Sequence, residues 1–508
     1  MNWRNQWSVA ILLMAGAVSA GCTTSLFKTT AQEQPPRRPA ARTGADYPGF
    51  RLEAGPRGEL SLLFMEKTPA HTGLLLNRST DYGATWQRPV TISQNPDPRA
   101  QMSPPSMQSD ATGIALAWRV KKPGSKTIYF TRSKDRGQTW PAEPTALIRE
   151  GSPFSPGLSA NPGSHLYLMW QDEERPVRDL KFMASSDAGS TWPAQPISLT
   201  AHLAAKGAHV YDSTFASDQT GRVYVAWHET GVAPSRRIVF TRSADFGQSW
   251  LSEPMAIRAL TDTTGPRFTS PVLIADTAGH VYLAWNETHS AGSDIYMTRS
   301  DDGGTTWPHP PVRLTSVSPG AVTVPQNLQF TVDRAGTLYA IWTEKVDETS
   351  QRVAFRRSID FGRSWEPIQF LDGEDREGRY SESPVIKVDE AGRVYVAWQQ
   401  WQRGAWGEWR IFFTRSEDHG VTWRREPIRL DTLPQTSARP RLRPLNLLAD
   451  GEGTVYVTWA GDPFGKVDGF LNRSKDYGVT WLPKEQWLTD PSSLVGHDTS
   501  APTVGPSR

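Results

Sequence analysis

Three tryptophans stand close together between Gln399 and Trp409, where they interrupt an otherwise regular chain. Trp401, Trp406 and Trp409 fall within nine residues. A connecting loop does not easily bury so many rings, and exposed tryptophan is enriched at binding hot spots. Because Trp faces stack on sugar rings or on aromatic partners, this segment is predicted to bind a glycan or a protein. The alternative is that the rings cover the loops of a neighbouring element.

Acidic residues also recur, at one position of a repeated unit, two residues beyond the end of a strand. A ring of carboxylates there would attract cations at a channel mouth. The favoured interpretation is a repeated partner for loop backbone or for arginine. The residues are Glu66, Asp172, Glu229, Glu287 and Glu344.

Composition excludes several classes of protein. Lys plus Arg number 55 and Asp plus Glu 53, so a net charge of +2 gives no case for a nucleic-acid partner. One cysteine excludes an internal disulfide framework. No His-x-x-x-His pair or cysteine cluster supports a transition metal, and no cofactor is predicted.

The element that must position these residues is a repeat with the pattern S-x-D-x-G-x-[TS]-W. Its aspartate can accept backbone N–H groups and close a turn, its glycine can take φ > 0, and its tryptophan can bury between sheets. Arginine precedes the serine in seven of the eight copies, which implies a structural role such as an ion pair in the turn. The copies begin at Ser79, Ser133, Ser185, Ser243, Ser300, Ser358, Ser416 and Ser474.

Two strand patterns precede each copy. One is apolar at nearly every position, as in Val223 to Trp227, which indicates a strand buried on both faces. The other alternates, as in Arg237 to Arg242. An Asp-x-x-Gly turn leads into the buried strand, and a short fourth strand follows the repeat. The chain is therefore predicted to be all-β, a single propeller of four-stranded antiparallel blades, with eight blades and with six or seven as alternatives.

The repeated pattern resembles the Asp box, or BNR repeat, of the sialidase superfamily, and its units span residues 47 to 490. Sialidases of this superfamily have six blades, so eight is a departure. In a propeller the boxes join the third strand to the fourth. They lie opposite the loop face, which is formed by the loops between strands 2 and 3 and between successive blades. The box aspartates are therefore expected to be structural.

The resemblance also implies an arginine triad for a substrate carboxylate, a tyrosine nucleophile and an aspartate acid/base. Arg51 stands where the first arginine is expected, although Glu53 replaces the family's proline. Arg119 is a candidate second arginine. The loop from Lys67 to Gly73 contains no carboxylate where the family's aspartate is expected.

Tyr380 is the candidate nucleophile, and Arg379 beside it is a candidate ligand-binding residue. Tyr211 and Phe268 stand in the same slot of other repeats, so tyrosine there is not distinctive.

The N-terminus predicts export and lipid anchoring. The apolar run from Val9 to Ala20 is shorter than the ~20 residues that span a bilayer, which is typical of a secretory signal peptide. Small residues before Cys22 resemble the bacterial lipobox, although Ser19 replaces the usual aliphatic residue. The predicted parts are a lipoprotein signal peptide at 1–22 with Cys22 as the lipidation site, a flexible Pro/Arg-rich tether at 23–46 and the propeller at 47–508. The residue after the cysteine is not Asp, which in bacterial lipoproteins implies the outer membrane of a Gram-negative cell.

Three functional hypotheses follow. The first is an envelope-anchored protein that binds a glycan or an envelope protein on its loop face and meets the membrane through its lipid. The second is an exo-α-sialidase or related glycoside hydrolase that uses Arg51, Arg119 and Tyr380. The third is a scaffold in an envelope complex. Whether the chain is an enzyme stays open at this level.

Overall fold

The computed structural model describes most of the chain between residues 50 and 488. The described ranges are 50–68, 70–97, 99–110, 113–161, 164–173, 178–204, 208–231, 236–260, 267–289, 292–315, 325–346, 350–373, 379–402, 408–432, 443–461 and 468–488. The predicted signal peptide, the tether, Cys22 and Trp406 lie outside them. The chain divides into units 1–40 and 41–508, and everything below concerns the second. No helix in the described ranges is long and apolar enough to cross a membrane.

Within these ranges the strands form antiparallel meanders, which we number as blades 1 to 8 in chain order. Blades 1 and 2 contain β1 (Phe50–Ala54), β2 (Leu60–Lys67), β3 (Thr72–Ser79), β4 (Val90–Asn95), β5 (Gln101–Met102), β6 (Ser106–Ser109), β7 (Ile114–Lys122), β8 (Ser125–Ser133) and β9 (Thr145–Ile148). Blades 3 and 4 contain β10 (Pro153–Ala160), β11 (Leu166–Asp172), β12 (Asp179–Ser185), β13 (Ile197–Ser198), helix α1 (Ala201–Ala204), β14 (His209–Ser217), β15 (Val223–Thr230), β16 (Arg236–Ser243) and β17 (Met255–Leu260).

Blades 5 and 6 contain β18 (Arg267–Ala275), β19 (Val281–His289), β20 (Gly292–Ser300), β21 (Val312–Arg313), β22 (Gln326–Val332), β23 (Leu338–Lys345), β24 (Gln351–Ser358) and β25 (Gln369–Phe370). Blades 7 and 8 contain β26 (Arg379–Val388), β27 (Val394–Gln402), β28 (Glu408–Ser416), β29 (Ile428–Arg429), β30 (Arg443–Ala449), β31 (Val455–Gly461), β32 (Asp468–Ser474) and β33 (Gln486–Trp487). The prediction of an all-β propeller with four-stranded blades is confirmed, and the blade count of the whole chain stays a prediction.

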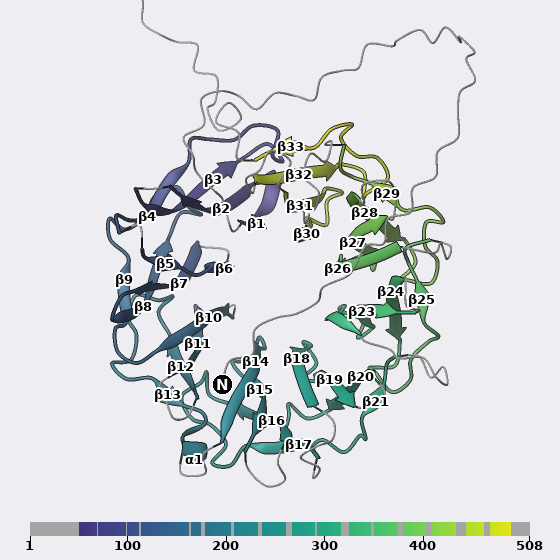
Figure 1. The fold of residues 1–508 in the computed structure, drawn as a ribbon. Coiled ribbons are helices and arrows are strands. Elements are labelled where there is room, and N and C mark those ends of the chain that lie inside the picture. The colour runs from purple at the N-terminus through teal and green to yellow at the C-terminus, as the bar shows by residue number, and fades with distance from the viewer. Residues whose placement is uncertain are drawn as a thin grey trace, which may run out of the picture. The chain divides into compact units, whose positions relative to one another are not determined.

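The second strand of each blade is its buried centre, as its apolar sequence predicts. In β15 every side chain except Thr230 is buried. Figure 1 shows the first strands, such as β10, β14 and β18, toward the centre and the last strands, such as β13, β17 and β21, toward the outside.

Hydrophobic seams join successive blades and close the ring. Between blades 4 and 5, for example, Tyr224 and Phe240 pack with Leu283. Between the last blade and the first, Leu52 packs with Leu471. The Asn446 amide nitrogen also donates to the Leu52 carbonyl at 2.5 Å, so side chains almost 400 residues apart hold the ring shut.

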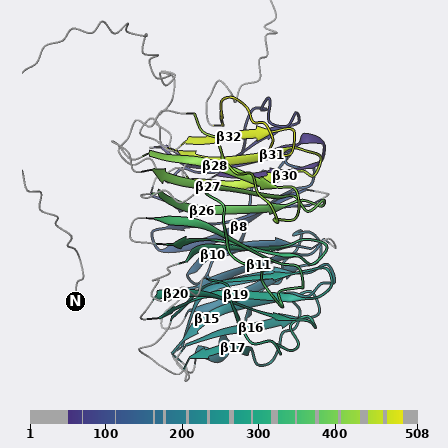
Figure 2. The ribbon, with the colours of Figure 1, turned by 90° about the vertical axis from the view of Figure 1, so that its right-hand side faces the viewer.

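The Asp boxes lie on one face, together with the turns between first and second strands. The backbone N–H of Tyr82 donates to Gly58 at 2.9 Å, and that of Phe246 donates to Gly221 at 2.9 Å. Equivalent strands of successive blades run roughly the same way (Figure 2). The strand ends away from the boxes therefore gather on the other face, which is the loop face. The predicted placement of boxes and loops on opposite faces is confirmed.

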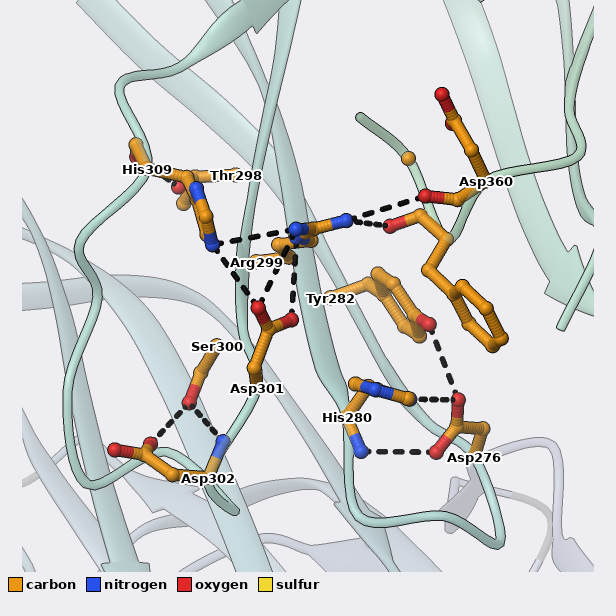
Figure 3. Close-up of polar contacts among 12 residues, drawn as sticks. Asp276, His280, Tyr282, Thr298, Arg299, Ser300, Asp301, Asp302, His309 and Asp360 are labelled. Carbon is orange, nitrogen blue, oxygen red and sulfur yellow. Dashed lines mark hydrogen bonds and ion pairs between the residues drawn. The ribbon is translucent and has the colours of Figure 1, made fainter. Parts of the chain in front are cut away.

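Each box is closed by its own hydrogen bonds. In Figure 3 the Ser300 hydroxyl donates to Asp302 at 2.7 Å and also accepts the Asp302 N–H at 3.4 Å. The Gly304 N–H donates to the same hydroxyl at 2.8 Å, and the Thr306 hydroxyl donates to Asp302 at 2.6 Å. With every carboxylate oxygen engaged in the turn, the structural role predicted for the box aspartates is confirmed.

The arginine before the box reaches the next blade. Arg299 donates to the carbonyls of Phe361 at 2.7 Å and Asp360 at 3.3 Å, which belong to the following box (Figure 3). Arg415 donates to the Tyr477 carbonyl at 3.1 Å in the same way. The predicted ion pair is also present, since Arg299 lies 3.2 Å from Asp301. We call the hydrogen bonds from this arginine to the next box the strut; only the packing of the blades reveals them.

Candidate functional site

The structure brings two predicted binding residues, Trp401 and Trp409, together with the candidate nucleophile Tyr380 on blade 7. Tyr380 on β26 is paired with Trp401 on β27, which is paired with Trp409 on β28. Residues opposite one another in antiparallel strands point to the same side of the sheet. The rings of Tyr380 and Trp401 meet edge to face, with centroids 5.9 Å apart. We call Tyr380, Trp401 and Trp409 the blade-7 aromatic row.

This row is half-buried rather than fully presented to solvent. Trp409 packs against the hydrophobic seam between blades 7 and 8. That packing is the covering role that the sequence left as the alternative. On the same side of the sheet, the Gln399 amide donates to Glu382 at 3.3 Å.

The candidate catalytic residues lie on three different blades. Arg51 is on β1, Arg119 on β7 and Tyr380 on β26. Figure 1 places β7 and β26 on opposite sides of the ring. Arg379 begins β26 next to Tyr380, so only the blade-7 residues are brought together.

The repeated acids serve as partners for neighbouring groups, as the favoured interpretation predicted. The buried Glu229 pairs with Arg237, and Glu287 lies 3.2 Å from Arg258. The remaining members accept bonds as well: Asp172 from the Ser152 N–H at 2.7 Å, Glu344 from the Trp342 indole at 3.0 Å, and Glu66 shares a 3.3 Å contact with His71.

A pocket that the sequence did not predict lies between blades 3 and 4. Its volume is about 640 Å³. It lies toward the loop face, because Glu173 follows β11 and Arg178 precedes β12. We call it the Phe154–Tyr211 pocket; its lining also includes Trp170, Glu173, Arg178, Asp212 and Phe215.

Two guanidinium groups stand over aromatic rings in and beside this pocket. The Arg178 guanidinium lies 4.9 Å from the centroid of Tyr211. Arg119 of blade 2 lies 4.9 Å from the centroid of Phe154. The Phe154 side chain is 39% exposed, and it is the one aromatic residue among the exposed large hydrophobic residues of the described ranges. Phe154 therefore lines the pocket with ring surface that solvent can reach.

The backbone of the innermost strands shapes the pocket. Register shifts occur between Phe154 and Gly157 on β10 and between Tyr211 and Thr214 on β14. Asp212 within the second bulge has φ of 44°. Bulges re-aim side chains, and here they lie where pocket residues leave the regular pairing.

A titratable cluster adjoins the bulge. His228 is paired with Tyr211 across the strands, and their rings lie 5.8 Å apart. Burial lowers the pKa of the His228 imidazole, while the Asp212 carboxylate opposes that shift. Glu173 lies 3.7 Å from Arg178. The pocket therefore combines aromatic faces with acidic, basic and phenolic groups.

Register also corrects the slot assigned to Tyr211. Tyr211 directly precedes the bulge of its strand, a position that Glu382 occupies in blade 7. Tyr380 lies two residues earlier and corresponds to His209. Tyr211 and Tyr380 therefore do not occupy equivalent positions in their blades. The bulge in the strand pairing shows this, and the sequence alone did not indicate the bulge.

Comparisons with known proteins find distant similarity. No family model matches the sequence. A xyloglucanase from a Paenibacillus species is 24% identical over 273 residues, which is 52% of this chain and 21% of that protein. The chain thus spans about a fifth of the length of this relative.

The similar solved structures are also distant in sequence. A Hadza microbial sialidase is 16% identical, with a TM-score of 0.37, over 75% of this chain and 74% of its own. An ulvan lyase is 12% identical, with a TM-score of 0.45, over 72% and 91% of the two chains. The four-stranded blades and the closed Asp-box turns decide the fold. It is a β-propeller with Asp-box turns. Function must be argued from this propeller's own site.

Proposed function

We propose that this propeller binds a carbohydrate chain in the Phe154–Tyr211 pocket. The observation that carries the proposal is the exposed Phe154 ring at a cavity of about 640 Å³. That volume falls in the range of about 300–1,000 Å³ typical of ligand sites. The apolar faces of sugar rings would pack on Phe154 and Tyr211.

Polar groups complete the proposed site. Arg178, Glu173 and Asp212 supply donors and acceptors for sugar hydroxyls around the two rings. A few charged groups among aromatic walls fix a ligand's orientation. The distant xyloglucanase relative supports a carbohydrate ligand and does not identify which one.

The test is affinity for soluble xyloglucan, arabinan and a sialoside, measured by calorimetry. Phe154→Ala should weaken the best binder about tenfold, or about 1.4 kcal/mol. Because Phe154 is already exposed, the fold should survive its truncation. Val421, an exposed residue on the Asp-box face (49%), is the matched control, and Val421→Ala should bind like the parent. Equal affinity of Phe154→Ala and the parent would reject the pocket.

The blade-7 aromatic row, with Arg379 next to Tyr380 on β26, remains the competing location. Trp401→Ala distinguishes the two. A loss of affinity in Trp401→Ala, with none in Phe154→Ala, would move the site to blade 7.

A glycoside hydrolase is the second candidate function. The observation that favours it is that two carboxylates, Glu173 and Asp212, line the same pocket as Tyr211. Glycoside hydrolysis commonly uses a carboxylate pair. Asp212→Asn should abolish release of reducing ends while binding is kept; release of reducing ends by neither protein would reject the enzyme.

We also propose that Cys22 anchors the chain to the cell envelope, in the outer membrane, where an envelope protein is the alternative partner and a scaffold the alternative role. Cys22→Ser should shift the protein from the membrane fraction to the soluble fraction. Retention of Cys22→Ser in the membrane fraction would contradict the lipid anchor.

A further inference from the structure

The arginine struts on the Asp-box face stiffen the seams between blades. Arg357 of blade 6 donates to the His419 carbonyl in the next box at 2.9 Å, and Arg473 of blade 8 donates to the Tyr82 carbonyl of blade 1. Hydrogen bonds from a charged donor are roughly twice as strong as neutral ones. Each strut thus resists relative motion of two blades at their box ends.

One seam has no residue that could form this strut. Ala184 of blade 3 occupies the position of the arginine, and its methyl group faces the next box, 3.5 Å from the position a Cβ would take on Gly247. The packing of this seam is otherwise regular, because Phe182 meets Trp250 edge to face at 4.9 Å. The arginine strut is missing, while Ser159 and Ser217 share a 3.3 Å hydrogen bond near the box end.

The same seam carries the Phe154–Tyr211 pocket at its other end. Between the two ends lies a hydrophobic core in which Tyr167 and Phe182 of blade 3 pack with Val225 and Trp227 of blade 4. Two hydrogen bonds of 3.3 Å cross the seam: Gln171 on β11 donates to Ser213 on β14, and Ser159 on β10 shares one with Ser217 on β14. The seam therefore has a packed middle, a box end without a strut and a hollow loop end.

We infer that the seam between blades 3 and 4 is a compliant joint of this propeller and lets the Phe154–Tyr211 pocket change its width around a ligand. The two blades rock about the hydrophobic core, and movement at the box end, which lacks an arginine strut, is matched by movement at the pocket. The ligand part rests on the proposed function, whereas the compliance does not.

A reversible crosslink tests the joint. Ser159 on β10 and Ser217 on β14 already place their hydroxyl oxygens 3.3 Å apart across the seam, so a Ser159→Cys/Ser217→Cys pair in a Cys22→Ser background can form a disulfide. Hydrogen exchange of β10, β11 and β14 is then compared between the oxidised and reduced forms of one protein. The backbone amides at this seam should exchange at least about fivefold more slowly in the oxidised form.

Two further variants separate the strut from the crosslink. Ala184→Arg should slow exchange at this seam, because the added guanidinium can reach the next box. Arg415→Ala should speed exchange at the seam between blades 7 and 8, where the strut is present. Unchanged exchange in the oxidised form and in Ala184→Arg would overturn the joint.

Ligand binding tests the second part, with xyloglucan oligosaccharides as the probe. The association rate should fall about fivefold on oxidation and recover on reduction, because the locked pocket samples fewer widths. Equal rates in both forms would overturn the link to binding. If the parent protein binds no xyloglucan oligosaccharide, the link falls with it, while slower exchange in the oxidised form would still support the joint.

Discussion

A pair of glycine substitutions in blade 8 separates packing between blades from backbone strain. Gly478 in the Asp box has φ of 83°, and a Cβ there would lie 2.7 Å from Phe413 Cζ of blade 7. Gly451 has φ of 78°, and a Cβ there would meet nothing within 4 Å. An alanine at either position bears the left-handed strain of about 1–2 kcal/mol. Only Gly478→Ala adds overpacking of about 1–3 kcal/mol.

Gly478→Ala should therefore lower the free energy of unfolding by about 2–5 kcal/mol and Gly451→Ala by about 1–2 kcal/mol. Phe413 cannot move aside easily, since it also meets Trp481 at 4.7 Å. Urea denaturation followed by tryptophan fluorescence measures both values. Equal losses in the two variants would refute the argument that the box glycine is required by its neighbour on the preceding blade.

Other perturbations follow from the same contacts. The Thr191 hydrogen bonds lower the pKa of Asp187 to about 2, below an unfolded value of about 3.9. The stabilisation of the folded state that results is present above pH ~4 and is lost as the pH falls through 2. Melting temperatures should therefore drop over that window, and an Asp187→Asn variant should show a smaller drop. Arg473→Ala should lower the free energy of unfolding by about 1–3 kcal/mol. The control Arg88→Ala, at an exposed position, should change it by less than about 0.5 kcal/mol. Similar losses in the two variants would show that the strut contributes nothing.

Much of the fold was predictable because the repeat is local. The Ser300-to-Trp307 box closes through bonds between residues two to four apart, so its sequence pattern carries its whole geometry. The buried second strand of blade 4 is recognisable in the sequence by its apolar run from Val223 to Trp227. Both follow from chemistry within one unit, and eight copies repeat the evidence.

The candidate site was less predictable. The spacing of the tryptophans marked Trp401 and Trp409 as candidates, and the strand register places Tyr380 beside them. The half-burial of the blade-7 aromatic row against blade 8 was decided by packing. The Phe154–Tyr211 pocket went unpredicted, because β10 and β14 belong to different blades and each carries a bulge that no sequence pattern marks.

The sequence by itself determined the repeated blade, the Asp-box turns and the buried strands, since those depend on residues close together in the chain. Only the tertiary structure decided which carbonyl each arginine reaches, where the ring leaves a cavity and that Arg119 stands over Phe154. These are contacts between residues of different blades. Their geometry is set by how whole sheets pack, a quantity that no single unit encodes.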